Sequence, residues 1–257
     1  SHFDYLLLSY VCYEQGVQLP HIAAGINLNM PIVGPILRRG GAFFLRRSFR
    51  GNRLYAAVFD AYLNQLLTRG YSIEYFVEGG RSRTGRLLAP KGGMLAMTVG
   101  SYIQNPRRPI VFVPVYFGYE KLIEGGAFLS ELGGAEKKKE SLFGLIRSIK
   151  ALRENFGRVY VNIGEPIELD NVLDGVQPDW RELPTGNGER PAWVNDVVGT
   201  LGDEIMGGIN AAAAVTPISL LAYVLLATPK QKIGATELRA QLQLSLDLLR
   251  QFEYSDS

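Results

Sequence analysis

Residues 73–86 read IEYFVEGGRSRTGR, an apolar strand that runs directly into a loop of glycines and arginines. The first part, Ile73 to Val77, is rich in residues that favour β structure. In open α/β sheets, ligands bind in the loops that follow the carboxyl ends of the strands. The order of strand and loop therefore predicts an α/β fold with a ligand site at the end of this strand.

The loop from Glu78 to Arg86 has the composition of an anion site. Its glycines, at positions 79, 80 and 85, allow backbone N–H groups to approach an anion closely. Its three arginines carry forked donors that match a phosphate group: Arg81, Arg83 and Arg86. The alternative is a glycine-rich turn with solvated arginines. So many arginines and glycines within nine residues favour the anion site.

Two better-known motifs do not fit this loop. A P-loop needs Gly-Lys followed by Ser or Thr, which the chain lacks. The nucleophile elbow G-x-S-x-G fails because Thr84 stands where its second glycine should be. Ser82 is therefore not predicted to be an acylated nucleophile.

Strands and helices alternate on both sides of this loop, which predicts a mixed, mostly parallel sheet flanked by helices, with a C-terminal helical extension. Strands are expected at 21–25, 42–45, 72–77, 109–117 (with Pro114 at a strand end) and 158–163, and helices at 4–13, 54–67, 93–102, 217–227 and 236–252. The expected organisation is an α/β core over 1–170, a surface connection over 171–191, and C-terminal helices over 192–257 that pack on the core.

Charge is distributed unevenly along the 257 residues. Residues 1–110 hold 13 Lys and Arg against 5 Asp and Glu, whereas residues 111–257 hold 14 against 20. A basic half indicates an anionic partner, such as a phosphate, coenzyme A, an acidic carrier protein or an anionic membrane. Nucleic acid is not expected, because no nucleic-acid-binding module surrounds the arginines.

Two segments bear on membrane contact. The stretch 205–229 has no charged residue, but Thr216-Pro217 predicts the start of a new helix, which leaves about half of the ~20 apolar residues that a span requires. Residues 30–37, MPIVGPIL, precede Arg38 and Arg39. This pattern fits a segment lying on an anionic bilayer and, equally, an ordinary loop packed on the core.

The cysteine and the second histidine, both potentially reactive, are expected to have structural roles. Cys12 lies in an apolar run and is expected to be a buried structural thiol, while His21 is expected to be structural. No metal-ligand cluster is predicted. The chain begins Ser-His-Phe-Asp without Met, which we interpret as an interior piece of a longer protein.

Four blocks, in order, resemble the glycerolipid acyltransferase family, and most closely its bacterial membrane-associated glycerol-3-phosphate 1-O-acyltransferases. The blocks are SHFDYLLLSY at 1–10, GAFFLRR at 41–47, FVEGGRSRTGR at 76–86 and VPVYFGYE at 113–120. A single block would be a weak signal. Four in the family's order are specific.

The first block of the family is His-x-x-x-x-Asp. Asp4 matches the aspartate, and His2 matches a second histidine that is not catalytic. The resemblance places the catalytic histidine one residue before an Arg that precedes Ser1, outside this sequence. Residues 1–257 alone are therefore expected to lack the base that accepts the proton of the alcohol.

The other blocks imply the substrate site. The resemblance assigns glycerol 3-phosphate binding to Phe44, Leu45 and Arg47, with Arg47 as a phosphate ligand. Glu78 and Gly79 match the family's key pair, and Glu78 is expected to accept a hydrogen bond from a glycerol hydroxyl. The remaining expected contacts are Arg81, Ser82, Arg83 and Pro114, although Pro114 also fits a simple strand-end kink.

The implied reaction moves a fatty acyl group from acyl-CoA or acyl carrier protein to the sn-1 hydroxyl of glycerol 3-phosphate, the first step of phospholipid biosynthesis. It needs no cofactor or metal, and is expected at the cytoplasmic face of the bacterial inner membrane, bound peripherally. The alternatives are an acyltransferase acting on dihydroxyacetone phosphate or lysophosphatidate, and a non-catalytic phosphate- or lipid-binding module.

Overall fold

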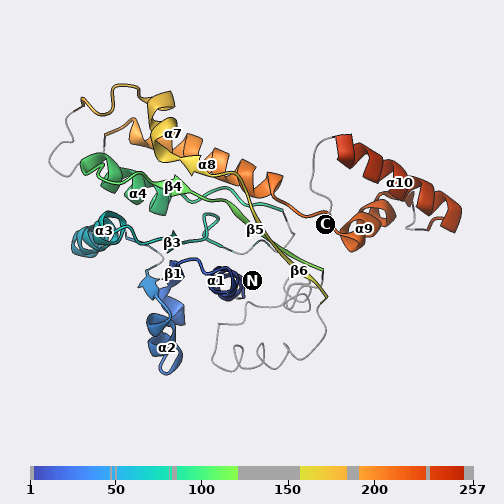
Figure 1. Ribbon diagram of the computed structural model, residues 1–257, viewed down its shortest axis with the longest axis horizontal. Coiled ribbons are helices and arrows are strands. Elements are labelled where there is room, and N and C mark those ends of the chain that lie inside the picture. Colours follow the sequence, from blue (N-terminus) through green and yellow to red (C-terminus); the bar gives the residue numbers. More distant parts are fainter. Residues whose placement is uncertain are drawn as a thin grey trace.

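The computed structural model describes residues 3–46, 48–49, 51–80, 82, 86–120, 157–183, 191–229 and 232–251. Within these ranges, a three-stranded sheet and two strand pairs are flanked by helices, and a pair of C-terminal helices stands beside this body (Figure 1). This is the mixed α/β architecture that the alternation of strands and helices predicts.

The central sheet is parallel and has the strand order β2-β1-β3. Strand β1 spans His21–Gly25, β2 spans Ala42–Leu45 and β3 spans Ile73–Glu74. The first two match the predicted ranges. Strand β3 is shorter than the predicted 72–77, because the chain leaves the sheet after Glu74 and turns.

The helices of the first half surround this sheet: α1 spans Asp4–Glu14, η1 Ile26–Leu28, α2 Val33–Arg39, α3 Arg53–Thr68 and α4 Gly92–Gln104. At the start of α3, the Asn52 side chain accepts a hydrogen bond of 2.9 Å from the Tyr55 amide, as a good N-cap does. Helix α3 then buries Phe59 and Leu66 against Phe43 of β2, which forms the smaller of two hydrophobic clusters.

Pro114 divides the next strand into two. Strand β4, Val111–Phe112, pairs antiparallel with β7, Ile167–Glu168, whereas β5, Val115–Tyr119, pairs antiparallel with β6, Val159–Ile163. Proline lacks the N–H that a continuous ladder needs, so the chain changes partner at this point. The predicted strand end at Pro114 is confirmed.

The segment expected as a surface connection begins in a helix, α7, which spans Leu169–Val176. Hydrogen bonds and ion pairs connect α7 to α4, and the chain after α7 to α7 itself. Tyr102 of α4 donates a 2.6 Å hydrogen bond to Asp170, and the Trp180 indole donates a 2.8 Å bond to Asp174. Arg181 forms ion pairs with both aspartates.

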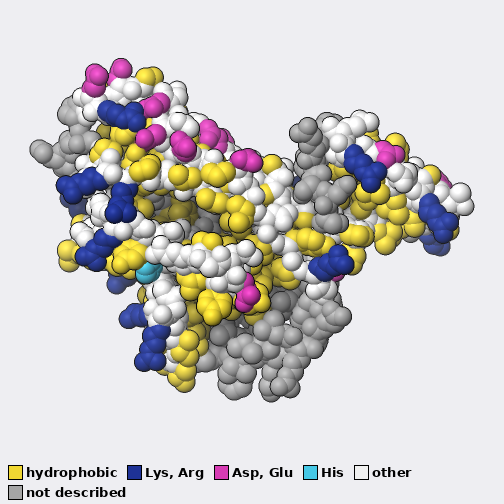
Figure 2. Space-filling view, viewed as in Figure 1, with side chains coloured by type: hydrophobic (Ala, Val, Ile, Leu, Met, Phe, Trp, Pro, Cys, Tyr) yellow, Lys and Arg dark blue, Asp and Glu magenta, His cyan; other side chains and the backbone are white. Residues whose placement is uncertain are grey.

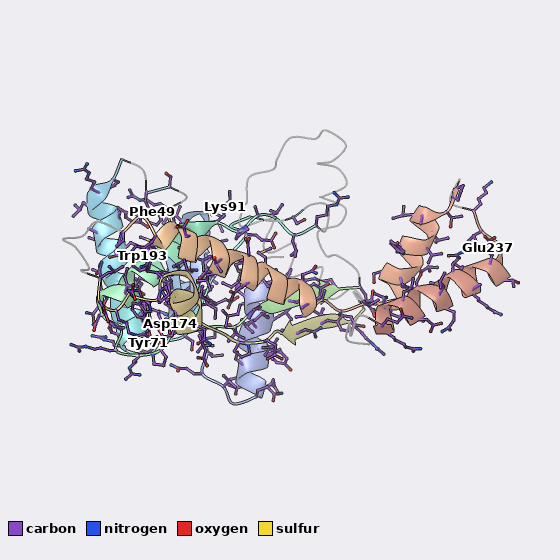
Figure 3. The ribbon with its side chains drawn as sticks, turned by 90° about the horizontal axis from the view of Figure 1, so that it is seen from above. Phe49, Tyr71, Lys91, Asp174, Trp193 and Glu237 are labelled. Carbon is purple, nitrogen blue, oxygen red and sulfur yellow. The ribbon has the colours of Figure 1, made fainter. Side chains whose placement is uncertain are left out.

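The C-terminal helices fall into two groups. Helix α8, Val194–Ala211, packs on α4, α7 and β5 and completes the larger hydrophobic cluster with its buried Val194, Val197 and Leu201. Helices α9, Pro217–Ala227, and α10, Ala235–Gln251, pack on each other and extend away from the body in both views (Figures 1 and 3).

Helix α9 begins as the Thr216-Pro217 signal predicts, with a capping box between Thr216 and Ser219. Among the helices in the described parts of the chain, none combines the length and the apolar character that crossing a bilayer requires.

Candidate active site

Asp4 lies in the first turn of α1 and is buried, with 8% of its surface exposed. Its Oδ1 accepts a hydrogen bond of 2.5 Å from the hydroxyl of Tyr119, the last residue of β5. A short bond to a buried carboxylate fixes the orientation of that group. The structure therefore orients the Asp4 carboxylate through Tyr119, a tyrosine that sequence reasoning did not single out.

A second carboxyl group, Glu74 at the end of β3, lies close enough for the charge of Asp4 to act on it. Both oxygens of Glu74 are buried and have no hydrogen-bond partner in the described parts of the chain. Burial, and secondarily the charge of Asp4, raises the pKa of Glu74 to about 7. An acidic residue inside the apolar run 73–77 was the signal that could have drawn attention to it.

Pro114, expected at the substrate site, is fully buried. Its ring packs against Gly164 and against Gly208 of α8, where even a Cβ atom on Gly208 would lie 2.7 Å from Pro114 Cγ. The Pro114 carbonyl accepts a 2.8 Å hydrogen bond from the Gly164 amide. Pro114 thus sets the position of β5, and through β5 the position of Tyr119 at the strand's far end.

The Glu78–Arg86 loop is closed by two hydrogen bonds between its ends. The Glu78 carboxylate accepts a 2.8 Å bond from the Leu88 amide, and the Val77 carbonyl accepts a 2.7 Å bond from the Lys91 amide. One oxygen of Glu78 therefore holds the loop together. The expected contact with a glycerol hydroxyl would fall to its other oxygen.

Gly79 allows Lys91 to lie against the loop. The backbone of Gly79 has a φ of +58°, which favours glycine, and a Cβ atom at this position would lie 2.7 Å from Lys91 Cγ. Lys91 is exposed and directly precedes α4, and it lies on the body of the molecule, away from α10 (Figure 3). A cation outside the four matched blocks thus borders the candidate phosphate loop.

The loop residues themselves are partly described. Ser82 has a buried Oγ with no hydrogen-bond partner in the described parts of the chain, and Arg86 is exposed. Arg81 and Arg83, and likewise Arg47 of the second block, lie outside the described residues.

Phe44 and Leu45 of β2 point to opposite faces of the sheet, as successive strand residues do. Leu45 packs on the cluster of Phe43 and Phe59. Phe44 lies on the α2 side, with the guanidinium of Arg38 5.3 Å from its ring centre. The two predicted substrate residues are therefore neighbours in sequence that line different sides of the parallel sheet.

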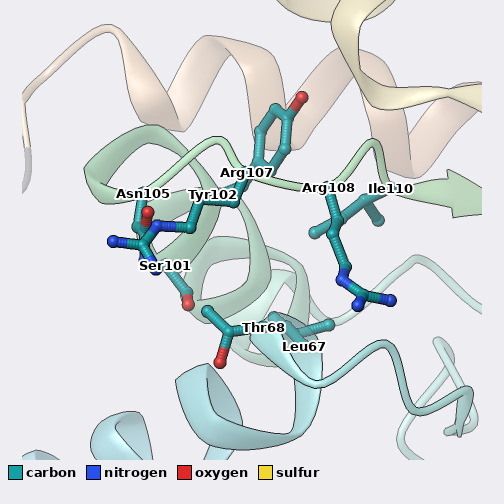
Figure 4. A pocket seen from close by; sticks show the side chains of 8 residues that line it. All are labelled: Leu67, Thr68, Ser101, Tyr102, Asn105, Arg107, Arg108 and Ile110. Atoms are coloured by element: carbon teal, nitrogen blue, oxygen red, sulfur yellow. The ribbon is translucent and has the colours of Figure 1, made fainter.

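A small cavity lies at the C-terminal end of α4, between the last turn of α4 and the last turn of α3. It measures about 10 Å³, and Thr68, Ser101 and Arg108 are among the residues lining it (Figure 4). This volume suits one water molecule at most. The Glu78–Arg86 loop precedes the opposite end of α4, so this cavity is separate from the candidate site.

Cys12 and His21 have structural surroundings. Cys12 is half-buried, and burial together with the charge of Glu74 raises its pKa, which makes its thiolate scarce. The His21 ring makes a 3.3 Å hydrogen-bond contact with the Gly41 carbonyl and an edge contact with Tyr71.

Comparison with known proteins finds relatives over the whole length of the chain. Residues 128–257 match the family model for the glycerol-3-phosphate acyltransferase C-terminal region, and residues 1–118 match an acyltransferase model. The chain is 57% identical over all 257 residues to a glycerol-3-phosphate acyltransferase of Xanthomonas campestris pv. campestris, and 56% identical over all 257 to one of Pseudomonas paraeruginosa. It spans 29% and 31% of the lengths of these relatives.

Proposed function

Because the chain belongs to the glycerol-3-phosphate acyltransferase family, we propose that it carries the site at which a fatty acyl group passes to the sn-1 hydroxyl of glycerol 3-phosphate. The observation that carries this proposal is that Asp4, which the sequence resemblance matches to the family's catalytic aspartate, is buried and accepts a hydrogen bond from Tyr119. The donors would be acyl-CoA or acyl carrier protein, and the reaction the first step of phospholipid biosynthesis.

In the proposed reaction the hydroxyl oxygen attacks the thioester carbonyl carbon, and the carbon–sulfur bond then breaks. The hydroxyl proton passes to a histidine upstream of Ser1 and from there to the departing thiolate. Asp4 orients that imidazole and stabilises its positive charge. Tyr119 keeps the Asp4 carboxylate from turning away, so the chemistry depends on the end of β5 as well as on α1.

Phosphate binding in this proposal falls to the Glu78–Arg86 loop and the end of β2. Arg47, Arg81 and Arg83 are the forked donors, the Ser82 hydroxyl supplies a neutral contact, and Lys91 adds a nearby positive charge. The Glu78–Leu88 bond supports this role, because a closed loop pays less entropy on binding than an open one.

The decisive experiment measures release of coenzyme A with three acceptors: glycerol 3-phosphate, dihydroxyacetone phosphate and lysophosphatidate. It uses this chain extended at its N-terminus by His-Arg, as the family pattern requires. We expect turnover with glycerol 3-phosphate and a loss of at least about a hundredfold in Asp4→Asn. Preference for another acceptor would select that alternative, and phosphate binding without turnover would select the non-catalytic module.

Tyr119→Phe tests the role of the tyrosine in the same assay. Losing a hydrogen bond to a buried carboxylate should lower kcat about tenfold and leave the KM for glycerol 3-phosphate unchanged. Tyr160→Phe on the adjacent β6 is the matched control, since its hydroxyl makes a weaker 3.4 Å contact with Glu120. Equal losses in both variants would contradict a specific role for Tyr119.

Arg47→Ala in the extended chain separates the two substrates. We expect the KM for glycerol 3-phosphate to rise far more than the KM for the acyl donor, because a phosphate ligand contacts one substrate only. An equal rise for both would remove Arg47 from the phosphate site.

We also propose a peripheral position at the cytoplasmic face of the bacterial inner membrane. The excess of basic residues over 1–110 supports an anionic surface as partner.

A further inference from the structure

Two isoleucines at the tip of α2 are held out in solvent. We call residues 30–39 the α2 tip. Ile32 is 70% exposed and Ile36 is 60% exposed, and Pro31 and Pro35 beside them are exposed as well. Ile32 directly precedes α2 and Ile36 lies in its first turn, so these exposed apolar residues are grouped at the start of the helix. Apolar surface left in water gains none of the free energy of burial, so these side chains contribute little to folding.

The backbone at Ile32 is in an unfavourable conformation. Its φ is +72°, and among the described residues it is the one non-glycine residue with positive φ. A β-branched side chain in this region is a genuine outlier. Strain of this kind persists where it serves a function or where surrounding contacts impose it. Here the Val33 amide donates a 2.9 Å hydrogen bond to the Pro31 carbonyl, which makes Ile32 the centre of a tight turn with an exposed side chain.

The neighbourhood of the tip is positively charged. From residue 15 to residue 59 the sequence has six arginines and no aspartate or glutamate. Arg38 and Arg39, in the last turn of α2, are both exposed. Figure 2 shows basic side chains and hydrophobic side chains next to each other around α2. Basic side chains beside exposed apolar ones fit an anionic lipid surface.

The α2 tip is also firmly attached to the sheet. Val33 and Gly34 are buried, and the Arg38 guanidinium donates a 3.2 Å hydrogen bond to the Asn29 side chain. The same guanidinium lies over the ring of Phe44 on β2. The tip is therefore presented by a packed element next to the proposed substrate site.

We propose that the α2 tip is the membrane-binding element of this chain, with Ile32 and Ile36 inserted among the lipid chains and Arg38 and Arg39 at the headgroup phosphates. The α9–α10 pair also exposes apolar side chains, but over residues 217–251 its four basic residues are offset by Glu237 and Asp247, whereas the sequence around α2 has no acidic residue from 15 to 59. Charge complementarity therefore favours α2. This inference rests on the proposed peripheral membrane position and does not depend on acyl transfer.

The test is sedimentation of this chain with vesicles of phosphatidylcholine alone or with about one-third phosphatidylglycerol added. We expect binding to the anionic vesicles. Ile32→Gly should weaken it about tenfold and raise the melting temperature, because glycine accepts the positive φ. Arg39→Gln should weaken binding about fivefold. The matched controls are Leu226→Asn on α9, which is 72% exposed in the parent, and Arg239→Gln on α10.

Insertion is read directly with Ile36→Trp, whose fluorescence should be quenched by bromine-labelled lipid, whereas that of Leu226→Trp should not. The proposal is overturned if the chain ignores anionic vesicles, if the control variants lose binding as much as the α2 variants, or if Ile32→Gly instead dissociates a dimer in ultracentrifugation. Vesicle binding needs no turnover, so failure of the acyl-transfer assay would leave this result standing.

Discussion

At the scale of single residues, Glu74 has an unusual position for a carboxyl group. It lies at the end of β3, its oxygens are buried without partners in the described parts of the chain, and Asp4 is near it. Its pKa of about 7, against an ordinary 4.5, means that the folded protein binds this proton more tightly than the unfolded chain does. Folding therefore becomes less favourable as pH rises from about 4.5 to about 7.

Glu74→Gln should remove this pH dependence. At pH 5 the variant should match the parent, and at pH 8 it should be more stable by up to about 3 kcal/mol, the free-energy equivalent of the pKa shift. Urea unfolding at both pH values measures the difference. Glu165→Gln, at an exposed position, is the control. A variant that is less stable than the parent at pH 8 would show that ionised Glu74 has a partner and does not lower the free energy of unfolding.

Gly79 and Gly80 form a matched pair of adjacent glycines. Gly79→Ala should destabilise the chain by about 1–2 kcal/mol, since it forces a Cβ into a positive φ and against Lys91. Gly80→Ala should have little effect, because no atom of the described residues lies within 4 Å of its Cβ position. Thermal unfolding of both variants is sufficient, and equal melting temperatures would contradict the close approach of Lys91.

At the scale of elements, α8 packs so closely on Pro114, between β4 and β5, that the contact leaves no space for an additional atom. Gly208 of α8 faces the buried ring of Pro114, and Pro114 sets the start of β5. Because Tyr119 at the end of β5 holds Asp4, the packing of a distant helix affects the position of the proposed catalytic aspartate.

Gly208→Ala should therefore cost about 1–3 kcal/mol of stability, in spite of the better helix propensity of alanine. In the extended chain it should also lower kcat. Gly207→Ala, one residue earlier, has open space and should be neutral or stabilising. Chemical unfolding and turnover of the pair provide the measurement. If both variants had the same free energy of unfolding, the contact between Gly208 and Pro114 would not affect stability.

At the scale of the whole molecule, stability is concentrated in the body. Leu201 of α8 is fully buried in the larger cluster, whereas α10 has no buried residue and packs on α9 alone among its stronger contacts. Helices α9 and α10 lie apart from the two clusters, and Glu237 on α10 is far from the labelled residues of the body (Figure 3).

Leu201→Ala should lower the free energy of unfolding by about 3 kcal/mol or more, because it leaves a cavity in a closely packed core. Leu244→Ala on α10, where the side chain is 55% exposed, should change it by less than about 0.5 kcal/mol. Denaturant titration of the two variants compares them. A large loss in Leu244→Ala would mean that α10 is covered in solution.

Local pattern was enough to predict many of the elements. The strands at 21–25 and 42–45 and the helix over 54–67 follow from runs of β-favouring residues and from apolar spacing, which act over a few neighbouring residues. The start of α9 was equally local, since a Thr cap and a Pro at the first position suffice. Motif order along the chain indicated the family, and the comparisons confirm it.

What needed the tertiary structure were contacts between segments far apart in the chain. Tyr119 meets Asp4 across 115 positions, and Glu74 owes its pKa to burial and to that same aspartate, which no local pattern specifies. Pro114 could be read from sequence as a strand end or as a substrate contact. Its burial against Gly208 makes it a support for β5. Motifs along the chain therefore predict which groups would do the proposed chemistry, whereas their supporting side chains become visible only in the fold, because packing joins residues that are far apart in sequence.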